Sequence, residues 1–205
     1  MANLILHEYA ASGNCYKIRL AAAHLGLPLE RREYDIMQGE TRSEDFLTGV
    51  NSNGRIPVLQ VGDDFLPESN AACCYLADGS DLIPTERFDR ADMLRWLFWE
   101  QYNHEPNVAT LRFWHEWIGA DNFTALQRTL EPVKREAGEA ALLLMDEHLA
   151  QTPFLVAGRF TLADIVLYAY THVCEGGQYQ LSRYPNVQAW LARVAALPGH
   201  ITIDA

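Results

Sequence analysis

The segment Ser12-Gly-Asn-Cys15 carries the side chains best suited to sulfur chemistry in this sequence. It follows a short apolar run, "NLILHEY", and precedes an alanine-rich stretch, so we expect a strand, a tight polar turn and the start of a helix there. A Cys-x-x-Cys redox pair would have cysteine at position 12, where this chain has serine. The motif is therefore either a redox pair that has lost its leading cysteine or a site that acts on the thiol of a bound molecule.

Stabilising a thiolate needs few protein groups. A thiol with a pKa of about 8.5 is mostly protonated at neutral pH, and it becomes a useful nucleophile when its anion is stabilised. The Ser12 hydroxyl, the Asn14 amide and the N-terminal dipole of the following helix can each favour that anion. We predict catalytic roles for Ser12 and Asn14; the alternative is that Ser12 only forms the turn or caps the helix.

Two further segments could bind a peptide-like ligand. Ile56 and Pro57 open a strand, where a cis peptide would leave the backbone of Ile56 free to pair with an extended peptide; the alternative is an edge-strand proline without a ligand. Glu68 and Ser69 stand where a strand ends and a helix begins. The free amides of a helix N-terminus favour a carboxylate near Ser69, and Glu68 could pair with an ammonium group; the alternative is simple capping by Ser69.

The elements that position these residues fall into two groups. The first eighty residues alternate strand and helix signals in the order βαβ then ββα, which predicts a mixed sheet with helices against it. A segment with linker composition follows, and beyond it we find only helical periodicity, over residues 89–117, 123–149, 161–174 and 187–197. The predicted fold class is α/β plus all-α: one domain at 1–79, a linker at 80–87 and an all-helical domain at 88–205.

Composition limits the partners. The chain has 205 residues, of which 49% are apolar and 21% charged, and its formal net charge of −11 disfavours nucleic acid. The N-terminal sequence has neither a basic leader nor a long apolar run, so we expect no signal peptide, no membrane span and a cytoplasmic location. The four cysteines show no zinc-type spacing, and we expect free, mostly buried thiols and no metal.

Four motifs in order, "SGNCYKIRL", "RIPVL", "ESNAACCYLA" and "GRFTLADIVLY", resemble those of the cytosolic glutathione transferase superfamily over essentially the whole chain. Serine three residues before a cysteine is similar to the theta and delta classes, and Ser12 with Asn14 is similar to the bacterial nu class. The resemblance implies a thioredoxin-like domain that binds glutathione, followed by a helical-bundle domain. In "GRFTLADIVLY", Thr161 and Asp164 have the spacing of a capping box, which in the family is a folding motif.

The resemblance also implies roles for single residues. Ser12 and Asn14 would face the glutathione sulfur, whereas Cys15 would pack. The contacts with the rest of glutathione would come from Ile56, Pro57, Glu68 and Ser69. The family's contact with the glycine carboxylate falls on Thr41 or Arg42, depending on how the "FLTGVN" segment is aligned, and Arg42 is the better carboxylate partner chemically.

The aromatic-rich stretch 95–117 is expected to be mainly core, with a break or kink after Glu105 caused by Pro106. In the family this helix lines the pocket for the second substrate. Three polar residues that interrupt its apolar pattern are the predicted pocket residues: Tyr102, Asn103 and Asn107. His104 is expected at the surface or between helices.

The predicted function is glutathione transfer to a small hydrophobic electrophile. A glutathione-dependent disulfide reductase, indicated by the nu-like Asn14, is the alternative, because both reactions need only a positioned thiolate. A third hypothesis is a binding module of the same fold without catalysis; retention of a hydroxyl at Ser12 argues against it. A homodimer is expected from the resemblance alone.

Overall fold

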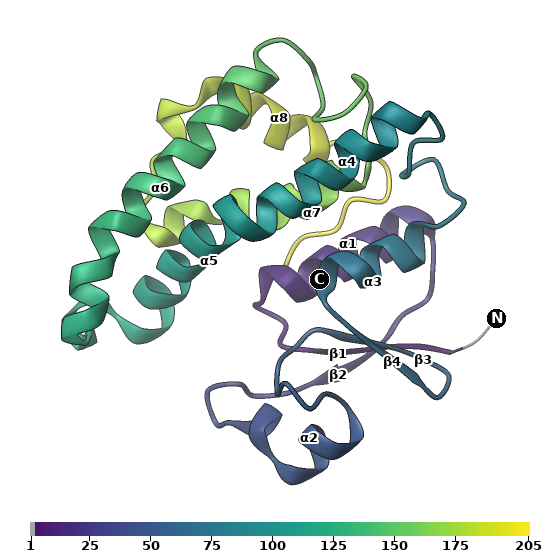
Figure 1. Cartoon of the computed structure of the whole chain (residues 1–205), viewed down its shortest axis with the longest axis vertical. Coiled ribbons are helices and arrows are strands. Elements are labelled where there is room, and N and C mark those ends of the chain that lie inside the picture. The colour runs from purple at the N-terminus through teal and green to yellow at the C-terminus, as the bar shows by residue number, and fades with distance from the viewer. Residues whose placement is uncertain (1–2) are drawn as a thin grey trace. The chain divides into compact units, whose positions relative to one another are not determined.

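The computed structural model describes residues 3–205, which form two compact units (Figure 1). The first unit comprises the chain up to Ile83 together with Pro198–Ala205, and the second comprises Pro84–Leu197. Within the described range, none of the helices combines the length and apolar character needed to cross a membrane.

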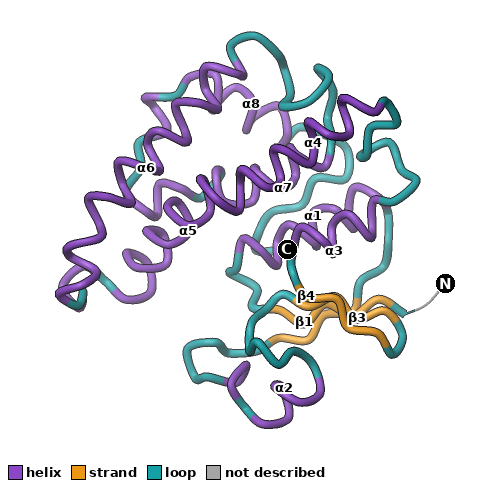
Figure 2. The backbone as a smooth tube through the Cα atoms, in the orientation of Figure 1, coloured by secondary structure: helices purple, strands orange, loops and turns teal. Residues whose placement is uncertain are grey.

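The first unit is built on a four-stranded sheet, drawn in orange in Figure 2. The strand order is β2-β1-β3-β4, with β1 parallel to β2 and antiparallel to β3, and β3 antiparallel to β4. The strands are β1 (Leu4–Glu8), β2 (Glu30–Glu33), β3 (Val58–Val61) and β4 (Asp64–Pro67). This mixed sheet confirms the thioredoxin-like order predicted from the sequence. The edge strand β2 is exposed and charged throughout, which discourages pairing with a further strand.

Helices α1 (Gly13–Leu25) and α3 (Ser69–Ala77) lie on one face of this sheet, and α2 (Glu44–Gly49) lies on the other side (Figure 1). Gly26 ends α1 in the left-handed conformation, with φ 64° and ψ 27°, and its N–H bonds to the carbonyls of Ala22 and Ala23. Glycine suits this C-cap position, because a residue with a Cβ adopts that conformation at a cost. The end of α1 is thereby set by a signal in the sequence.

The second unit contains five α-helices within the described range: α4 (Arg87–Trp99), α5 (Glu105–Phe113), α6 (Ala125–Leu149), α7 (Leu162–Thr171) and α8 (Pro185–Ala195). The predicted break at Pro106 is replaced by a π-helical turn, Glu100–His104, which joins α4 to α5 without interruption. Pro106 has no N–H for the preceding turn, and the N–H of Glu105 bonds to the carbonyl of Glu100, five residues back. The wider turn accommodates the proline, so the helical path continues.

A buried carboxylate organises the start of α7, as the predicted capping box requires. Asp164 accepts bonds from the N–H of Thr161 (2.9 Å) and of Leu155 (3.0 Å), and from the indole N–H of Trp190 (2.9 Å). All ten residues of α7 are buried. Thr161 and Asp164 therefore serve stability, as the sequence indicated.

The last eight residues pack in the first unit, whereas the sequence placed them in the helical domain, 88–205. The Tyr16 hydroxyl donates to the carbonyl of Ile201 (2.6 Å), and Arg19 donates to the carbonyls of Ile203 and Ala205, both at 2.9 Å. These bonds go to backbone carbonyls, which every residue has, so no side-chain pattern in 198–205 could indicate them. The boundaries 1–79, 80–87 and 88–205 stay a prediction.

Candidate active site

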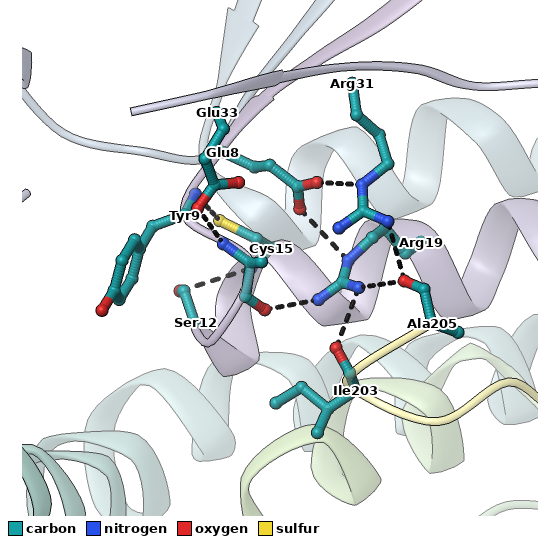
Figure 3. Close-up of polar contacts among 10 residues, drawn as sticks. Glu8, Tyr9, Ser12, Cys15, Arg19, Arg31, Glu33, Ile203 and Ala205 are labelled. Carbon is teal, nitrogen blue, oxygen red and sulfur yellow. Dashed lines mark hydrogen bonds and ion pairs between the residues drawn. The ribbon is translucent and has the colours of Figure 1, made fainter. Parts of the chain in front are cut away.

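Ser12 is the N-cap of α1, with extended backbone angles of φ −74° and ψ 125°. Its Oγ accepts a hydrogen bond from the N–H of Cys15 at 3.4 Å, drawn as a dashed line in Figure 3. The hydroxyl also interacts with the neighbouring Cys15 thiol, whose pKa it lowers, and donates no other hydrogen bond within the described range. The capping alternative is thus observed, and it uses the acceptor side of the hydroxyl; the donor side meets only a buried, neutral thiol and can serve an anion instead.

Cys15 is fully buried, and its Sγ accepts a bond from the N–H of Tyr9 at 3.5 Å. Burial raises the pKa of the Cys15 thiol to about 12, and the hydrogen bonds from Tyr9 and Ser12 lower it by less than burial raises it. A thiol with this pKa is protonated at neutral pH and is a poor nucleophile. The environment of Cys15 supports the packing role that the family resemblance implied.

The predicted thiol site and the predicted carboxylate site touch each other. The Ser69 hydroxyl donates to Asn14 Oδ1 at 3.1 Å, so the first turn of α3 is bonded to the first turn of α1. Ser69 is buried and is the first residue of α3, and its side chain makes no capping bond. The alternative that Ser69 is simply the N-cap is therefore wrong: Glu68 occupies that position.

Glu68 has φ 73° and ψ 109°, a conformation that residues with a side chain rarely adopt. Such a conformation costs on the order of 1–3 kcal/mol and persists where the surrounding structure enforces it, often at a binding site. The Glu68 side chain is exposed. The turn between β4 and α3 thus presents a carboxylate beside a helix N-terminus, which is the arrangement predicted for a ligand with both charges.

The peptide bond between Ile56 and Pro57 is cis, as predicted. Pro57 is buried directly before β3, and Ile56 is half-buried. In the part of the chain that the structure describes, the backbone N–H and C=O of Ile56 have no hydrogen-bond partner. They are therefore available to pair with an extended ligand.

The two candidates for the glycine carboxylate differ in exposure. Thr41 is buried, whereas Arg42 is exposed and donates to the carbonyl of Asn53 at 3.0 Å. Gly54 permits this approach: at φ 62° its backbone leaves no room for a Cβ, which would lie 2.6 Å from Arg42 Nη1 and 2.9 Å from the carbonyl of Thr41. Exposure therefore favours Arg42 as the carboxylate ligand.

Two cationic side chains near these residues, Arg55 and Lys17, were not predicted from the sequence. Arg55 directly precedes Ile56, is exposed, and its guanidinium bonds to no side chain or backbone group from residue 3 to 205. Its place next to the predicted peptide-pairing residue was an available signal. Lys17 is fully buried on α1, and its Nζ donates to Asn70 Oδ1 at 3.3 Å, one residue beyond Ser69. Nothing in the local sequence pattern distinguishes Lys17 from a solvated lysine.

The residues predicted for the second substrate lie in and just after the π-helical turn. Tyr102 is 85% exposed. Asn103 and Asn107 are half-buried and donate to their own helix, to the carbonyls of Trp99 (3.4 Å) and Asn103 (2.7 Å). His104 is buried and lies 3.0 Å from the hydroxyl of Thr171 on α7, so it is an inter-helix residue.

The fold and the site together define a class of protein: a thioredoxin-like domain with a serine hydroxyl where a redox enzyme would have a cysteine, followed by a helical domain. The sequence matches the family description "Glutathione S-transferase, N-terminal domain" over residues 3–78 and "Glutathione S-transferase, C-terminal domain" over residues 124–193. The chain therefore belongs to the glutathione S-transferase family.

Individual relatives agree. The chain is 30% identical to glutathione S-transferase 3 of Zea mays over 97% of this chain and 91% of the relative. Among solved structures it is similar to a glutathione S-transferase from Pseudomonas fluorescens, with 42% identity, a TM-score of 0.92 and 98% of each chain covered. One from Xanthobacter autotrophicus has 37% identity and a TM-score of 0.91, over 98% of this chain and 97% of the other. These findings confirm the predicted superfamily and enzyme class.

Proposed function

We propose that this protein binds glutathione in its first unit and stabilises the glutathione thiolate through Ser12 for attack on a small hydrophobic electrophile. The observation that carries the proposal is the state of the Ser12 hydroxyl. Its oxygen caps α1 through the N–H of Cys15, and its proton has no anionic partner in the described residues, since the Cys15 thiol beside it is neutral. A thiolate placed at this helix N-terminus would receive that proton as a hydrogen bond and would gain from the helix dipole.

The charges of the first unit suit the rest of glutathione, which has a carboxylate at each end and an ammonium group beside one of them. The backbone of Ile56 would pair with the cysteinyl residue. Ser69 and the N-terminus of α3 would hold the γ-glutamyl carboxylate, with Glu68 at the ammonium group. Arg42 would hold the glycine carboxylate, with the exposed Arg55 as a second cation nearby.

The test of Ser12 is the pKa of bound glutathione, followed through the ultraviolet absorbance of its thiolate. We expect the wild-type protein to lower that pKa by about 1–3 units. In Ser12→Ala the pKa should rise most of the way back to the value of free glutathione. Ser12→Thr is the matched control, because it keeps the hydroxyl. If Ser12→Ala binds glutathione with an unchanged thiol pKa, Ser12 does not have the proposed role.

A second reaction uses the same thiolate. Asn14, two residues after Ser12 and bonded to Ser69, favours glutathione-dependent disulfide reduction as the alternative, as the nu-like motif suggests. Steady-state assays with a chloronitrobenzene and with a small organic disulfide separate the two. Turnover of the disulfide with none of the chloronitrobenzene would contradict the transferase proposal.

Tyr102, Asn103 and Asn107 remain the proposed contacts for the second substrate. Because Asn103 and Asn107 donate to carbonyls of their own helix, alanine at either position would also disturb the helix. Tyr102, at 85% exposure, is the cleaner test. Tyr102→Phe and Tyr102→Ala should change KM for the chloronitrobenzene without changing KM for glutathione.

We also propose a homodimer and a cytoplasmic location. Exposed aromatic side chains support the first: Tyr75 is 50% exposed on α3, and Phe88 and Phe98 are 82% and 72% exposed on α4. Aromatic side chains are enriched in the buried centres of protein interfaces, so a dimer would have a use for side chains of this kind. Sedimentation velocity would test the dimer, and Phe98→Glu should dissociate it. Cell fractionation would test the location.

A further inference from the structure

The guanidinium of Arg19 is buried at the point where three parts of the first unit meet (Figure 3). Arg19 lies on α1, seven residues after Ser12, and is only 4% exposed. Its Nη2 donates to the carbonyl of Ala10 at 2.6 Å, and its Nη1 donates to the carbonyls of Ile203 and Ala205, both at 2.9 Å. Its Nε pairs with Glu8 Oε2 at 3.1 Å. The guanidinium thus contacts three segments: it donates hydrogen bonds to two of them and forms an ion pair with Glu8.

Ala10 belongs to the turn that carries Ser12, and it is held from both sides. Arg19 binds its carbonyl, and the Glu33 carboxylate accepts its N–H at 2.8 Å. The turn closes when the N–H of Ser12 bonds to the carbonyl of Tyr9 at 2.9 Å. Bonds to charged groups are roughly twice as strong as neutral ones, so the two clamps on Ala10 fix the backbone two residues before Ser12.

Arg19 is itself held in place. Glu8, the last residue of β1, is fully buried, and its carboxylate also pairs with Arg31. Arg31 donates to the carbonyl of Ala205 at 2.7 Å as well. Arg31 therefore shares two partners with Arg19, the Glu8 carboxylate and the Ala205 carbonyl, but it makes no contact with Ala10. Arg19 has two further contacts, with Ile203 and with Ala10, and only the one with Ala10 leads to Ser12.

We propose that Arg19 is a positioning residue for Ser12: it transmits the fixed geometry of β1 and of residues 198–205 to the turn that aims the Ser12 hydroxyl at the thiolate. The inference rests on the proposed role of Ser12. Arginine suits this task because its planar fork binds in several fixed directions at once, whereas a lysine ammonium is a single point on a flexible stem. A hydroxyl displaced by a fraction of an ångström loses much of its bond to an anion.

The experiment compares Arg19→Lys with Arg31→Lys in the full chain, with the pKa of bound glutathione as the readout. We expect Arg19→Lys to raise that pKa by about half a unit to one unit, which is part of the Ser12→Ala shift, with KM for glutathione changed less than about twofold. Arg31→Lys loses bonds to the same two partners and should leave the pKa within about 0.2 units. A general loss of stability would not move the thiol pKa of the folded protein.

Further variants keep the outcome decisive. If Arg19→Lys does not fold, Glu33→Ala replaces it, because Glu33 is exposed and holds the other side of Ala10; it should raise the thiol pKa in the same direction. The inference is refuted if bound glutathione has the same thiol pKa in Arg19→Lys and Arg31→Lys. It is also refuted if Glu33→Ala, used in place of Arg19→Lys, leaves that pKa unchanged. If Ser12→Ala shifts the pKa and these variants do not, only the inference fails. If Ser12→Ala itself shifts nothing, the proposed role of Ser12 fails, and the inference with it.

Discussion

The Ser69 hydroxyl donates its single proton to Asn14 Oδ1, 3.1 Å away, and this bond joins the N-termini of α1 and α3. In the proposed complex the same proton would serve the γ-glutamyl carboxylate, so Asn14 and the ligand compete for it. The backbone N–H of Ser69, at the start of α3, offers the carboxylate a donor that does not depend on Asn14. The two halves of the proposed site are therefore coupled through one hydrogen bond.

The first prediction concerns this coupling. Ser69→Ala should raise KM for glutathione about tenfold, since a hydrogen bond to a charged group contributes about 1.5–3 kcal/mol, and should leave the thiol pKa unchanged. Asn14→Ala should mainly raise the thiol pKa. Because the residues touch, the double variant should be non-additive by at least about 0.5 kcal/mol in glutathione binding, measured by calorimetry. Strict additivity would contradict the coupling.

The second prediction concerns the glycine carboxylate. Arg42→Ala should raise KM for glutathione several-fold, and the effect should shrink as salt is added, because an exposed cation is screened. Thr41→Val, which keeps the buried volume, should leave KM unchanged and is the control. Arg55→Ala tests the second cation. If Arg55→Ala raises KM for glutathione more than Arg42→Ala does, Arg55 and not Arg42 binds the glycine carboxylate.

Local signals account for most of what could be predicted from the sequence. The Ser12 cap, the Gly26 cap, the cis-proline and the capping box at Thr161 each depend on residues adjacent in the chain, and the structure has all four. The order of strands follows from the order of these elements, since short connections allow few topologies.

The missed features depend on partners distant in sequence. The partners of Lys17 and Arg19 lie 53 and up to 186 residues away, and several are backbone carbonyls. The π-helical turn contains His104, which contacts Thr171, 67 residues further along the chain, and no local pattern indicates that contact. The position of Ser69 between a strand and a helix is typical of a helix cap. Its partner is instead Asn14, which lies 55 residues away in the sequence and cannot be identified from the local pattern.

The third prediction concerns Cys15. Because burial raises its pKa to about 12, its thiolate fraction at pH 8 is lower than that of an ordinary cysteine by about three orders of magnitude. Iodoacetamide at pH 8 should therefore modify the half-buried Cys74 long before Cys15, as followed by mass spectrometry of peptides. Cys15→Ala should keep the thiol pKa of bound glutathione. Rapid alkylation of Cys15 accompanied by loss of activity would instead make it the nucleophile.

The fourth prediction concerns the pH dependence of stability through Asp164. Burial raises the pKa of this carboxyl from 3.8 to about 6, and the hydrogen bonds from Leu155, Trp190 and Thr161 oppose the rise. Between pH 4 and pH 6 the folded state therefore binds more protons at Asp164 than the unfolded state does. The contribution of Asp164 to the free energy of unfolding is then largest below about pH 4 and falls as the pH rises, by up to about 3 kcal/mol.

Asp164→Asn isolates this effect from the other carboxyl groups, which both proteins share. The amide replaces one oxygen acceptor by a donor that faces the N–H of Thr161 or of Leu155, so the variant should be less stable at every pH. Urea unfolding at pH 4, 5, 6 and 7 should show a difference between wild type and variant that is largest at pH 4 and shrinks toward pH 7. A difference that grows with pH would mean that the donors around Asp164 outweigh its burial and keep the carboxylate ionised in the folded state.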